Sequence, residues 1–314
     1  MNTRQITAAA ATVRAFLVQP AALRKTIPCH FFHSATRSLL NSNQLFMEAG
    51  RTLSLVLLVG VIWSQLQFGA DAASTTVFTL LNNCTYTVWP ATLSGNSAVA
   101  VGGGGFELAP GATVSFPGPA GWSGRLWART DCVPAPSGAS LSCATGDCGG
   151  AVRCSLGGAP PVTLAEFTLG GADGKDFYDV SLVDGYNVGI GVTATGDKVN
   201  LSTCGYAGCV GDVNALCPAE LQVAGKGGGQ SSGTTTAAAT TVACRSACEA
   251  FGTPEYCCTG EHGGPDSCGP TRYSRLFKAA CPAAYSYAYD DPTSTFTCGA
   301  GAQYLITFCP AQQQ

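Results

Sequence analysis

Three carboxylates interrupt two apolar, strand-like runs near the middle of the chain. Glu166 falls in the run 162–169, while Asp179 and Asp184 fall in or directly after the run 177–183. A carboxylate that is buried without a partner costs several kcal/mol, so each of these groups must face water, meet a partner or line a cleft. We therefore take the three carboxylates as the starting point for a candidate site.

Two kinds of chemistry suit such a group. Glycoside hydrolysis needs a carboxylic acid of raised pKa to protonate the leaving oxygen and a second carboxylate as base or nucleophile. Glu166 would be the acid and Asp184 its partner. The alternative is recognition without reaction, in which the carboxylates hold sugar hydroxyls or a cationic patch on a target. Phe177, Tyr178 and Tyr186 are then candidates for stacking on sugar rings, although such aromatic residues more often belong to the core.

The spacing of the carboxylates sets a condition on the fold. A strict two-residue period places Asp179 and Asp184 on opposite faces of a strand. The two side chains converge only if the strand ends or bends near Asp184-Gly185, which is a turn pair. We therefore predict a bend at that point.

The surrounding chain reads as short strands separated by Gly- and Pro-rich turns, which is typical of an all-β sandwich or barrel. Helical patterns occur at 271–280 and at 244–251, where a helix would place Cys244 and Cys248 on one face. The low-complexity segment 226–241 is expected to be a surface loop. Other expected strands span 75–81, 86–89, 106–108, 112–116, 124–130, 293–297 and 304–308.

The chain begins with segments that read as processing sequence. Residues 47–73 combine a positive start, a short apolar run and small residues, so they predict a secretory signal peptide cleaved after Ala72 or Ala73. Residues 1–46 contain no Asp or Glu and resemble a transit peptide. We favour the alternative that Met47 is the true start, because an internal signal peptide would not serve an organelle import route.

Charge and cysteine content define the class of the mature segment 74–314. It holds 10 Lys and Arg against 17 Asp and Glu, a formal net charge of −7, so we expect no nucleic-acid partner. Sixteen of the 17 cysteines lie in this segment, and an even number behind a signal peptide predicts eight disulfides. Adjacent Cys257 and Cys258 should have different partners. We expect no metal site, since Cys-x-x-Cys pairs are absent and His262 is the one histidine of the segment.

Several segments, in their order along the chain, resemble the thaumatin-like proteins, the group-five pathogenesis-related proteins of plants. They read CATGDCGGAVRC, PPVTLAEFTL, DFYDVSLVDGYN, CPAELQ, YCCTG, AYSYAYDD, STFTC and YLITFCP. The resemblance extends over residues 75–310 and includes all sixteen cysteines. It implies the disulfides Cys84–Cys309, Cys132–Cys143, Cys148–Cys154, Cys204–Cys298, Cys209–Cys281, Cys217–Cys244, Cys248–Cys257 and Cys258–Cys268.

The resemblance also implies a mainly β fold with three parts. A β-sandwich core would span 74–130, 162–208 and 282–314, a small disulfide-rich loop region 131–161, and a disulfide-rich, partly helical region 209–281. A cleft would run between the sandwich and the helical region. The residues that line it in the family fall here on Arg125, Glu166, Asp179, Asp184 and Asp290, with Asp290 preferred to Asp291.

The function implied is that of a secreted, antifungal plant defence protein. It would bind β-1,3-glucan of the fungal cell wall through the acidic cleft, and disturb the wall or the fungal membrane surface. One alternative is a weak endo-β-1,3-glucanase that uses Glu166 and Asp184, and another is a stress-induced extracellular protein without a glycan ligand. We expect a monomer without a cofactor, in the apoplast, cell wall or vacuole. Asn200 is a candidate glycosylation site.

Overall fold

The structure is a computed structural model, and it describes residues 76–96, 100–196, 204–225, 240–299 and 301–311. The expected leader, the signal peptide, Asn200 and most of the loop 226–241 lie outside the described residues. None of the helices in the described part of the chain combines the length and apolar character needed to cross a membrane.

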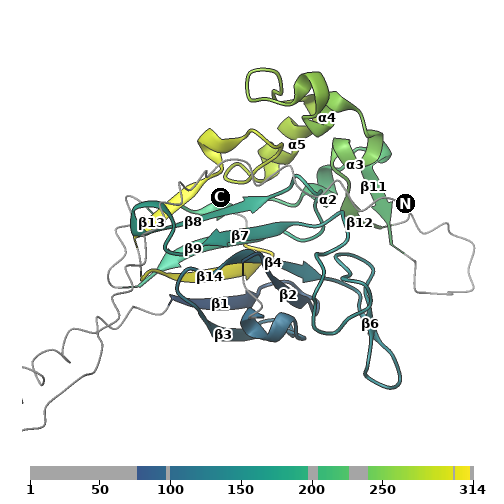
Figure 1. The fold of residues 1–314 in the computed structure, drawn as a ribbon. Coiled ribbons are helices and arrows are strands. Elements are labelled where there is room, and N and C mark those ends of the chain that lie inside the picture. Colours follow the sequence, from purple (N-terminus) through teal and green to yellow (C-terminus); the bar gives the residue numbers. More distant parts are fainter. Residues whose placement is uncertain (1–75, 97–99, 197–203, 226–239, 300, 312–314) are drawn as a thin grey trace, which may run out of the picture. The chain divides into compact units, whose positions relative to one another are not determined.

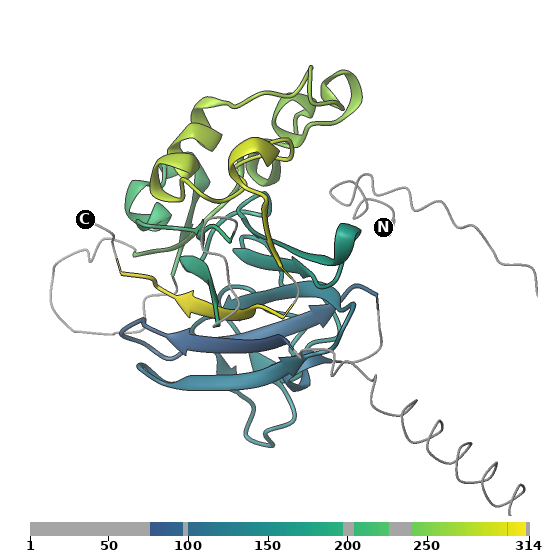
Figure 2. The ribbon, with the colours of Figure 1, turned by 90° about the vertical axis from the view of Figure 1, so that its left-hand side faces the viewer.

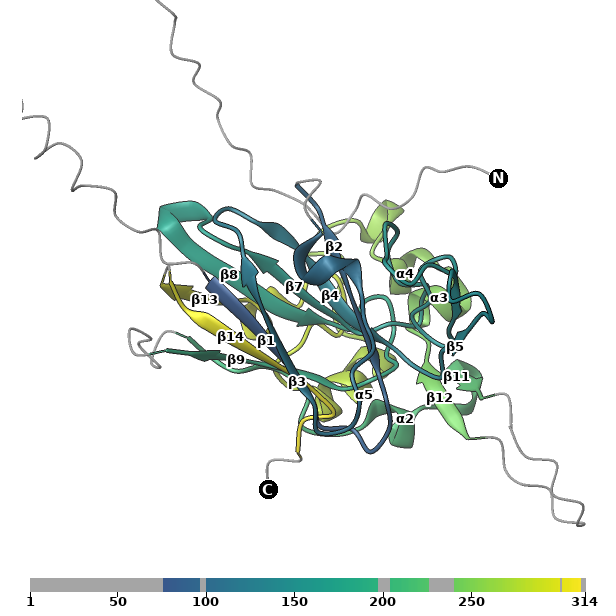
Figure 3. The ribbon, with the colours of Figure 1, turned by 90° about the horizontal axis from the view of Figure 1, so that it is seen from below.

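Two five-stranded sheets form the core of the fold (Figure 1). In the first sheet, of order β10-β9-β14-β1-β3, β1 and β14 are parallel neighbours, although they come from opposite ends of the described chain (Figure 2). Its strands are β1 Thr76–Asn82, β3 Thr113–Gly118, β9 Ile190–Thr195, β10 Ala207–Gly208 and β14 Gln303–Phe308. The second sheet, of order β13-β8-β7-β4-β2, is entirely antiparallel (Figure 3). Its strands are β2 Trp89–Ser94, β4 Ser123–Arg129, β7 Leu164–Thr168, β8 Lys175–Ser181 and β13 Phe296–Gly299.

Aromatic side chains join the facing surfaces of the two sheets. The ring of Phe78 on β1 lies 4.9 Å, centroid to centroid, from the ring of Phe167 on β7, in an edge-to-face arrangement. Tyr304 on β14 contacts Phe167 at 5.1 Å and Tyr178 on β8 at 5.2 Å. Because side chains alternate between the two faces of a strand, the residues next to these core positions must project from the outer face of the second sheet.

A small loop region covers part of that outer face. It contains the two-stranded sheet of β5 Val133–Pro134 and β6 Leu141–Ser142, and its bridges Cys132–Cys143 and Cys148–Cys154. The fully buried Arg129 holds this region against the sandwich. Its guanidinium donates hydrogen bonds to the carbonyl oxygens of Trp89, Ala151 and Val152 at 3.1, 2.7 and 3.1 Å.

The helical region lies above β8 in the view of Figure 1, and the bridge Cys209–Cys281 joins the end of its longest helix to the chain just after β10 of the first sheet. It contains α2 Val213–Leu216, α3 Ala247–Phe251, α4 Pro254–Cys257, α5 Arg272–Ala280, and the strands β11 Gln222–Ala224 and β12 Thr241–Cys244. The expected helix at 271–280 is confirmed as α5, which Thr271 and Ser274 begin with a reciprocal capping box.

The prediction of one helix that carries both Cys244 and Cys248 is wrong. Cys244 ends strand β12, and α3 begins only at Ala247, after Ser246 has capped it. The two cysteines bridge to separate places, Cys217 and Cys257. Other strand predictions also differ from the structure, and no strand forms at the expected 106–108, where Leu108 makes only an isolated bridge to Val88. The strand expected at 86–89 begins instead at Trp89, and a 3-10 turn at Asp291–Thr293 precedes β13.

Eight disulfides close the fold, as expected from the even number of cysteines. They join the same pairs that the family resemblance implied: Cys84–Cys309, Cys132–Cys143, Cys148–Cys154, Cys204–Cys298, Cys209–Cys281, Cys217–Cys244, Cys248–Cys257 and Cys258–Cys268. Cys257 and Cys258 do have different partners. The fold is therefore mainly β and heavily cross-linked.

Candidate functional site

Three charged side chains form a row across neighbouring strands of the second sheet. Arg125 on β4 is directly opposite Glu166 on β7, and Glu166 is directly opposite Asp179 on β8. Directly opposed residues on antiparallel strands project from the same face, with Cβ atoms about 4.5–5.5 Å apart. The other face of these strands carries the aromatic core, so the register places all three charges on the outer face. We call these three residues the charged row.

Asp184 joins the charged row through the predicted bend. Strand β8 ends at Ser181, and the backbone N–H of Gly185 donates to the carbonyl oxygen of Leu182 at 3.0 Å, which closes a turn. Gly185 has a φ of 87°, a conformation that glycine adopts without strain. The charge of Asp184 raises the pKa of Glu166, so the two carboxyl groups lie within electrostatic reach of each other. The bend predicted at Asp184-Gly185 is confirmed.

Burial and mutual repulsion disfavour the ionised forms of these acids. Burial raises the pKa of Glu166, an effect that the charge of Arg125 opposes and that of Asp184 reinforces. Burial, together with the charges of Glu166 and Asp291, raises the pKa of Asp179 well above its ordinary value. Oδ1 of Asp179 is buried and has no hydrogen-bond partner among the described residues. The row therefore contains an acceptor that no group of the described chain satisfies.

Arg125 acts on the acids as a neighbouring charge. Among the described residues, the ion pairs at salt-bridge distance are Arg272–Glu220 and Lys278–Asp290, so Arg125 and Glu166 do not form a closed pair. Burial raises the pKa of Asp184, and the charge of Arg125 opposes this effect. The guanidinium can thus donate to a ligand at the row.

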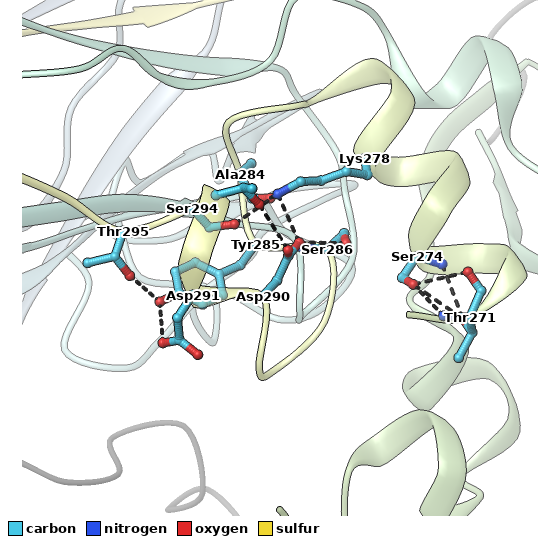
Figure 4. Close-up of polar contacts among 11 residues, drawn as sticks. Thr271, Ser274, Lys278, Ala284, Tyr285, Ser286, Asp290, Asp291, Ser294 and Thr295 are labelled. Atoms are coloured by element: carbon cyan, nitrogen blue, oxygen red, sulfur yellow. Dashed lines mark hydrogen bonds and ion pairs between the residues drawn. The ribbon is translucent and has the colours of Figure 1, made fainter. Parts of the chain in front are cut away.

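Asp290 belongs to a different network (Figure 4). Its Oδ2 accepts hydrogen bonds from Lys278 Nζ at 2.9 Å and from the backbone N–H and hydroxyl of Ser286 at 3.0 and 2.8 Å, and Oδ1 accepts from the Thr293 hydroxyl at 3.1 Å. The residue is 9% exposed. These contacts tie α5 to the loop before β13 and leave the Asp290 carboxylate occupied by its own chain.

The neighbouring Asp291 has different surroundings from Asp290. Asp291 is exposed, and its Oδ1 accepts a hydrogen bond of 2.8 Å from the hydroxyl of Tyr285, which also contacts the Thr295 hydroxyl (Figure 4). The charge of Asp291 raises the pKa of Asp179. Asp291 is therefore the member of this pair whose charge acts on the charged row, while the choice of Asp290 or Asp291 as a site residue stays a prediction.

The proposed stacking residues are mostly core residues. Tyr178 and Tyr186 are only 1% and 3% exposed, so neither can meet a sugar ring, and that prediction is wrong for both. Phe177 is partly exposed and shares the outer face with Asp179, two residues further along β8. It is the one of the three that retains accessible surface on the side of the charged row.

A further acid was missed by the sequence analysis. Glu249 on α3 is exposed as a residue, but partial burial of its carboxyl, together with the charge of Asp184, raises its pKa to about 7 against the opposing charge of Arg245. The only signal in the sequence was Ser246-x-x-Glu249, which indicates a helix start. The backbone N–H of Glu249 indeed donates to the Ser246 hydroxyl at 3.2 Å.

An aromatic hollow lies close to Asp184. It is lined by Val183, by Tyr256 and Tyr273 of the helical region, and by Tyr287 of the loop before β13. The hollow and the acids around Asp184 together offer apolar ring surface next to hydrogen-bonding groups. This combination is the usual composition of a small-molecule site.

Comparisons with known proteins agree with the fold. The family model described as "Thaumatin family" matches residues 82–310. The chain belongs to the thaumatin family. It is 57% identical over 239 residues to pathogenesis-related protein 5 of Arabidopsis thaliana, and this alignment covers 76% of the chain and 92% of the relative. It is 56% identical over 245 residues to pathogenesis-related thaumatin-like protein 3.5 of Cryptomeria japonica, which covers 78% of this chain and 94% of the relative.

One relative of this thaumatin-family chain has an enzyme name. The chain is 47% identical over 259 residues to a glucan endo-1,3-beta-glucosidase of Prunus avium, which covers 82% of this chain and 99% of the relative. The match therefore extends over nearly the whole length of that relative.

Proposed function

We propose that this thaumatin-family protein is a secreted, antifungal plant defence protein that binds β-1,3-glucan at the charged row. The observation that carries the proposal is the cross-strand register of Arg125, Glu166 and Asp179, with Asp179 Oδ1 left buried and unsatisfied. A buried acceptor without a partner costs free energy in the unliganded protein, and a donor from a ligand removes that cost.

The chemistry of the row matches the hydroxyl groups of a glucan. Each sugar hydroxyl can donate one hydrogen bond and accept others. Ionised carboxylates accept such bonds strongly, the Arg125 guanidinium donates, and a carboxyl of raised pKa does both. Phe177 and the aromatic hollow beside Val183 supply apolar surface for the faces of the rings. The site thus offers every type of contact that a β-1,3-glucan segment requires.

A second candidate is slow hydrolysis of the same polymer. Glu166 has the raised pKa that a general acid needs, and Asp184 is the nearby carboxylate that would act as base or nucleophile. The name of the Prunus avium relative favours this reading. In that case β-1,3-glucan would be the substrate of the protein as well as its ligand.

One pair of assays separates these functions. Pull-down on insoluble β-1,3-glucan and release of reducing sugar are measured for the native protein, for Glu166→Gln and for the control Glu107→Gln, which changes an exposed carboxylate on the sandwich. We expect binding by the native protein and the control, and weaker binding by Glu166→Gln. Binding without sugar release rejects the enzyme, and release that survives Glu166→Gln rejects Glu166 as the acid. If the native protein neither binds nor releases sugar, both proposals fail, and an extracellular protein without a glycan ligand remains.

The proposal extends to location and partners. Secretion to the apoplast or cell wall, with the vacuole as the alternative, places the protein where fungal wall polysaccharide or the fungal membrane surface is met. The eight disulfides support this location, since such bridges persist in oxidising compartments. We propose that the protein acts as a monomer and without a cofactor.

A further inference from the structure

A second hollow, of about 210 Å³, lies away from the charged row. Tyr86 and Tyr186 line it, together with Asp212 and Asn214 at the start of α2 and the end of the chain at Cys309 and Pro310. None of the charged-row residues takes part in this lining. The hollow is a separate feature that the proposed glucan site does not use.

The hollow contains a hydrogen-bond acceptor without a partner in the described structure. Oδ1 of Asn214 is buried and has no partner among the described residues, while its Nδ2 donates to the carbonyl oxygen of Asn187 at 3.1 Å. That second contact fixes the orientation of the amide, because exchanging its O and N atoms would bring two oxygens together. The Asn214 side chain therefore presents an acceptor that lacks a donor.

Asp212 brings negative charge to the two tyrosines. Its carboxylate accepts from the backbone N–H of Asn214 at 3.0 Å, and its proximity raises the pKa of Tyr186, in addition to the effect of burial. Burial is the largest cause that raises the pKa of Tyr86. The charge of Asp212 is the next largest, and the charge of Asp131 adds to it. Both carboxylates thus act on the same tyrosine ring, which is 44% exposed.

No cation of the described chain neutralises this charge. The two ion pairs found among the described residues are Arg272–Glu220 and Lys278–Asp290, neither of which lies at the hollow. Metal binding is also a poor match, because no group of three His, Cys, Asp or Glu side chains gathers in the described part of the chain. The hollow is therefore anionic and partly aromatic.

We propose that this hollow binds the ammonium group of a small organic amine. An ammonium has three donors and no acceptor, which complements the Asp212 carboxylate and the Asn214 amide oxygen. The electron-rich face of Tyr86, the exposed one of the two tyrosines, attracts a cation as well. A neutral sugar fits less well, since it carries no charge to complement the Asp212 carboxylate.

The proposal is tested with the full chain and 1,4-diaminobutane, by calorimetry or NMR titration at pH 7 and low salt. Its neutral analogue 1,4-butanediol and glucose serve as matched controls. The test variant is Asp212→Asn, in which asparagine keeps the N-cap of α2, since it caps helices as well as aspartate does. Glu261→Gln changes an exposed carboxylate of the helical region and controls for loss of charge alone.

We expect the diamine to bind the native protein and Glu261→Gln equally, with an affinity that falls as salt is added. Asp212→Asn should weaken binding about tenfold, and Tyr86→Leu about two- to fivefold. The proposal is overturned if the native protein does not bind the diamine, if butanediol or glucose binds as well as the diamine, or if Asp212→Asn binds it like the native protein.

Discussion

Replacing Asp179 with asparagine should make the protein more stable at neutral pH. The folded structure raises the pKa of Asp179 well above its ordinary value, so the folded state holds this proton more tightly than the unfolded chain does. Ionisation of Asp179 then opposes folding. The contribution of Asp179 to the free energy of unfolding is greatest below about pH 3.9, the pKa of aspartate in the unfolded chain. It is lost as the pH rises through the higher pKa of Asp179 in the folded state. Asparagine has the same shape but no charge to bury.

The size of the gain follows from the register of the charged row. Two ionised carboxylates at Glu166 and Asp179, roughly 5 Å apart at an effective dielectric constant of about 20, repel by roughly 3 kcal/mol. The buried Oδ1 of Asp179 has no hydrogen bond in the described structure to offset this cost. Protonation of one partner limits the penalty, so we expect Asp179→Asn to add about 1–3 kcal/mol to the free energy of unfolding at pH 7.

Equilibrium unfolding in guanidinium chloride, with the disulfides intact, measures this gain at pH 3 and pH 7. The gap between Asp179→Asn and the native protein should be small at pH 3 and should open as the pH rises. The control Glu107→Gln should change stability by less than about 0.5 kcal/mol at either pH. A loss of stability in Asp179→Asn at pH 7, or a difference that does not depend on pH, would refute the electrostatic reasoning.

Three further predictions concern the scaffold, and unfolding free energies test each of them. Lys278→Met should cost about 2–4 kcal/mol, because it strands a largely buried carboxylate (side chains 24% and 12% exposed). Arg272→Met, in a pair whose side chains are 74% and 45% exposed, should cost far less. Equal losses would contradict this contrast. Arg129→Met should cost about 3 kcal/mol or more and expose the small loop region to proteases, since three partly buried carbonyl oxygens lose their donor. Replacing both cysteines of the Cys84–Cys309 bridge, which spans 225 residues, should cost about 5 kcal/mol, and a loss under about 1 kcal/mol would show that the termini are held otherwise.

Local sequence patterns predicted the elements that carry the site. The alternation around Glu166 and Asp179 indicated strands, and the Asp184-Gly185 pair indicated the turn that ends β8. The register that aligns Arg125 with Glu166 depends on pairing between strands some 40 residues apart. Periodicity within one strand carries no information about such pairing, and only the family resemblance connected Arg125 with the carboxylates.

Long-range contacts explain where the sequence analysis failed. Asp290 and Asp291 are adjacent and chemically identical, and Lys278, which reaches Asp290 from α5, gives them different surroundings. Helical spacing grouped Cys244 with Cys248, but their bridges lead to different partners. In both cases, a residue distant in the chain decided the local structure, which a reading of neighbouring residues could not detect.

The most direct test of the account is a crystal structure of the protein with a β-1,3-linked glucose oligosaccharide. We predict sugar hydroxyls within about 2.7–3.2 Å of Arg125, Glu166 and Asp179, with one hydroxyl donating to the Asp179 Oδ1 that the described chain leaves unsatisfied. An oligosaccharide bound on another surface, with the charged row still holding only water, would contradict the central claim.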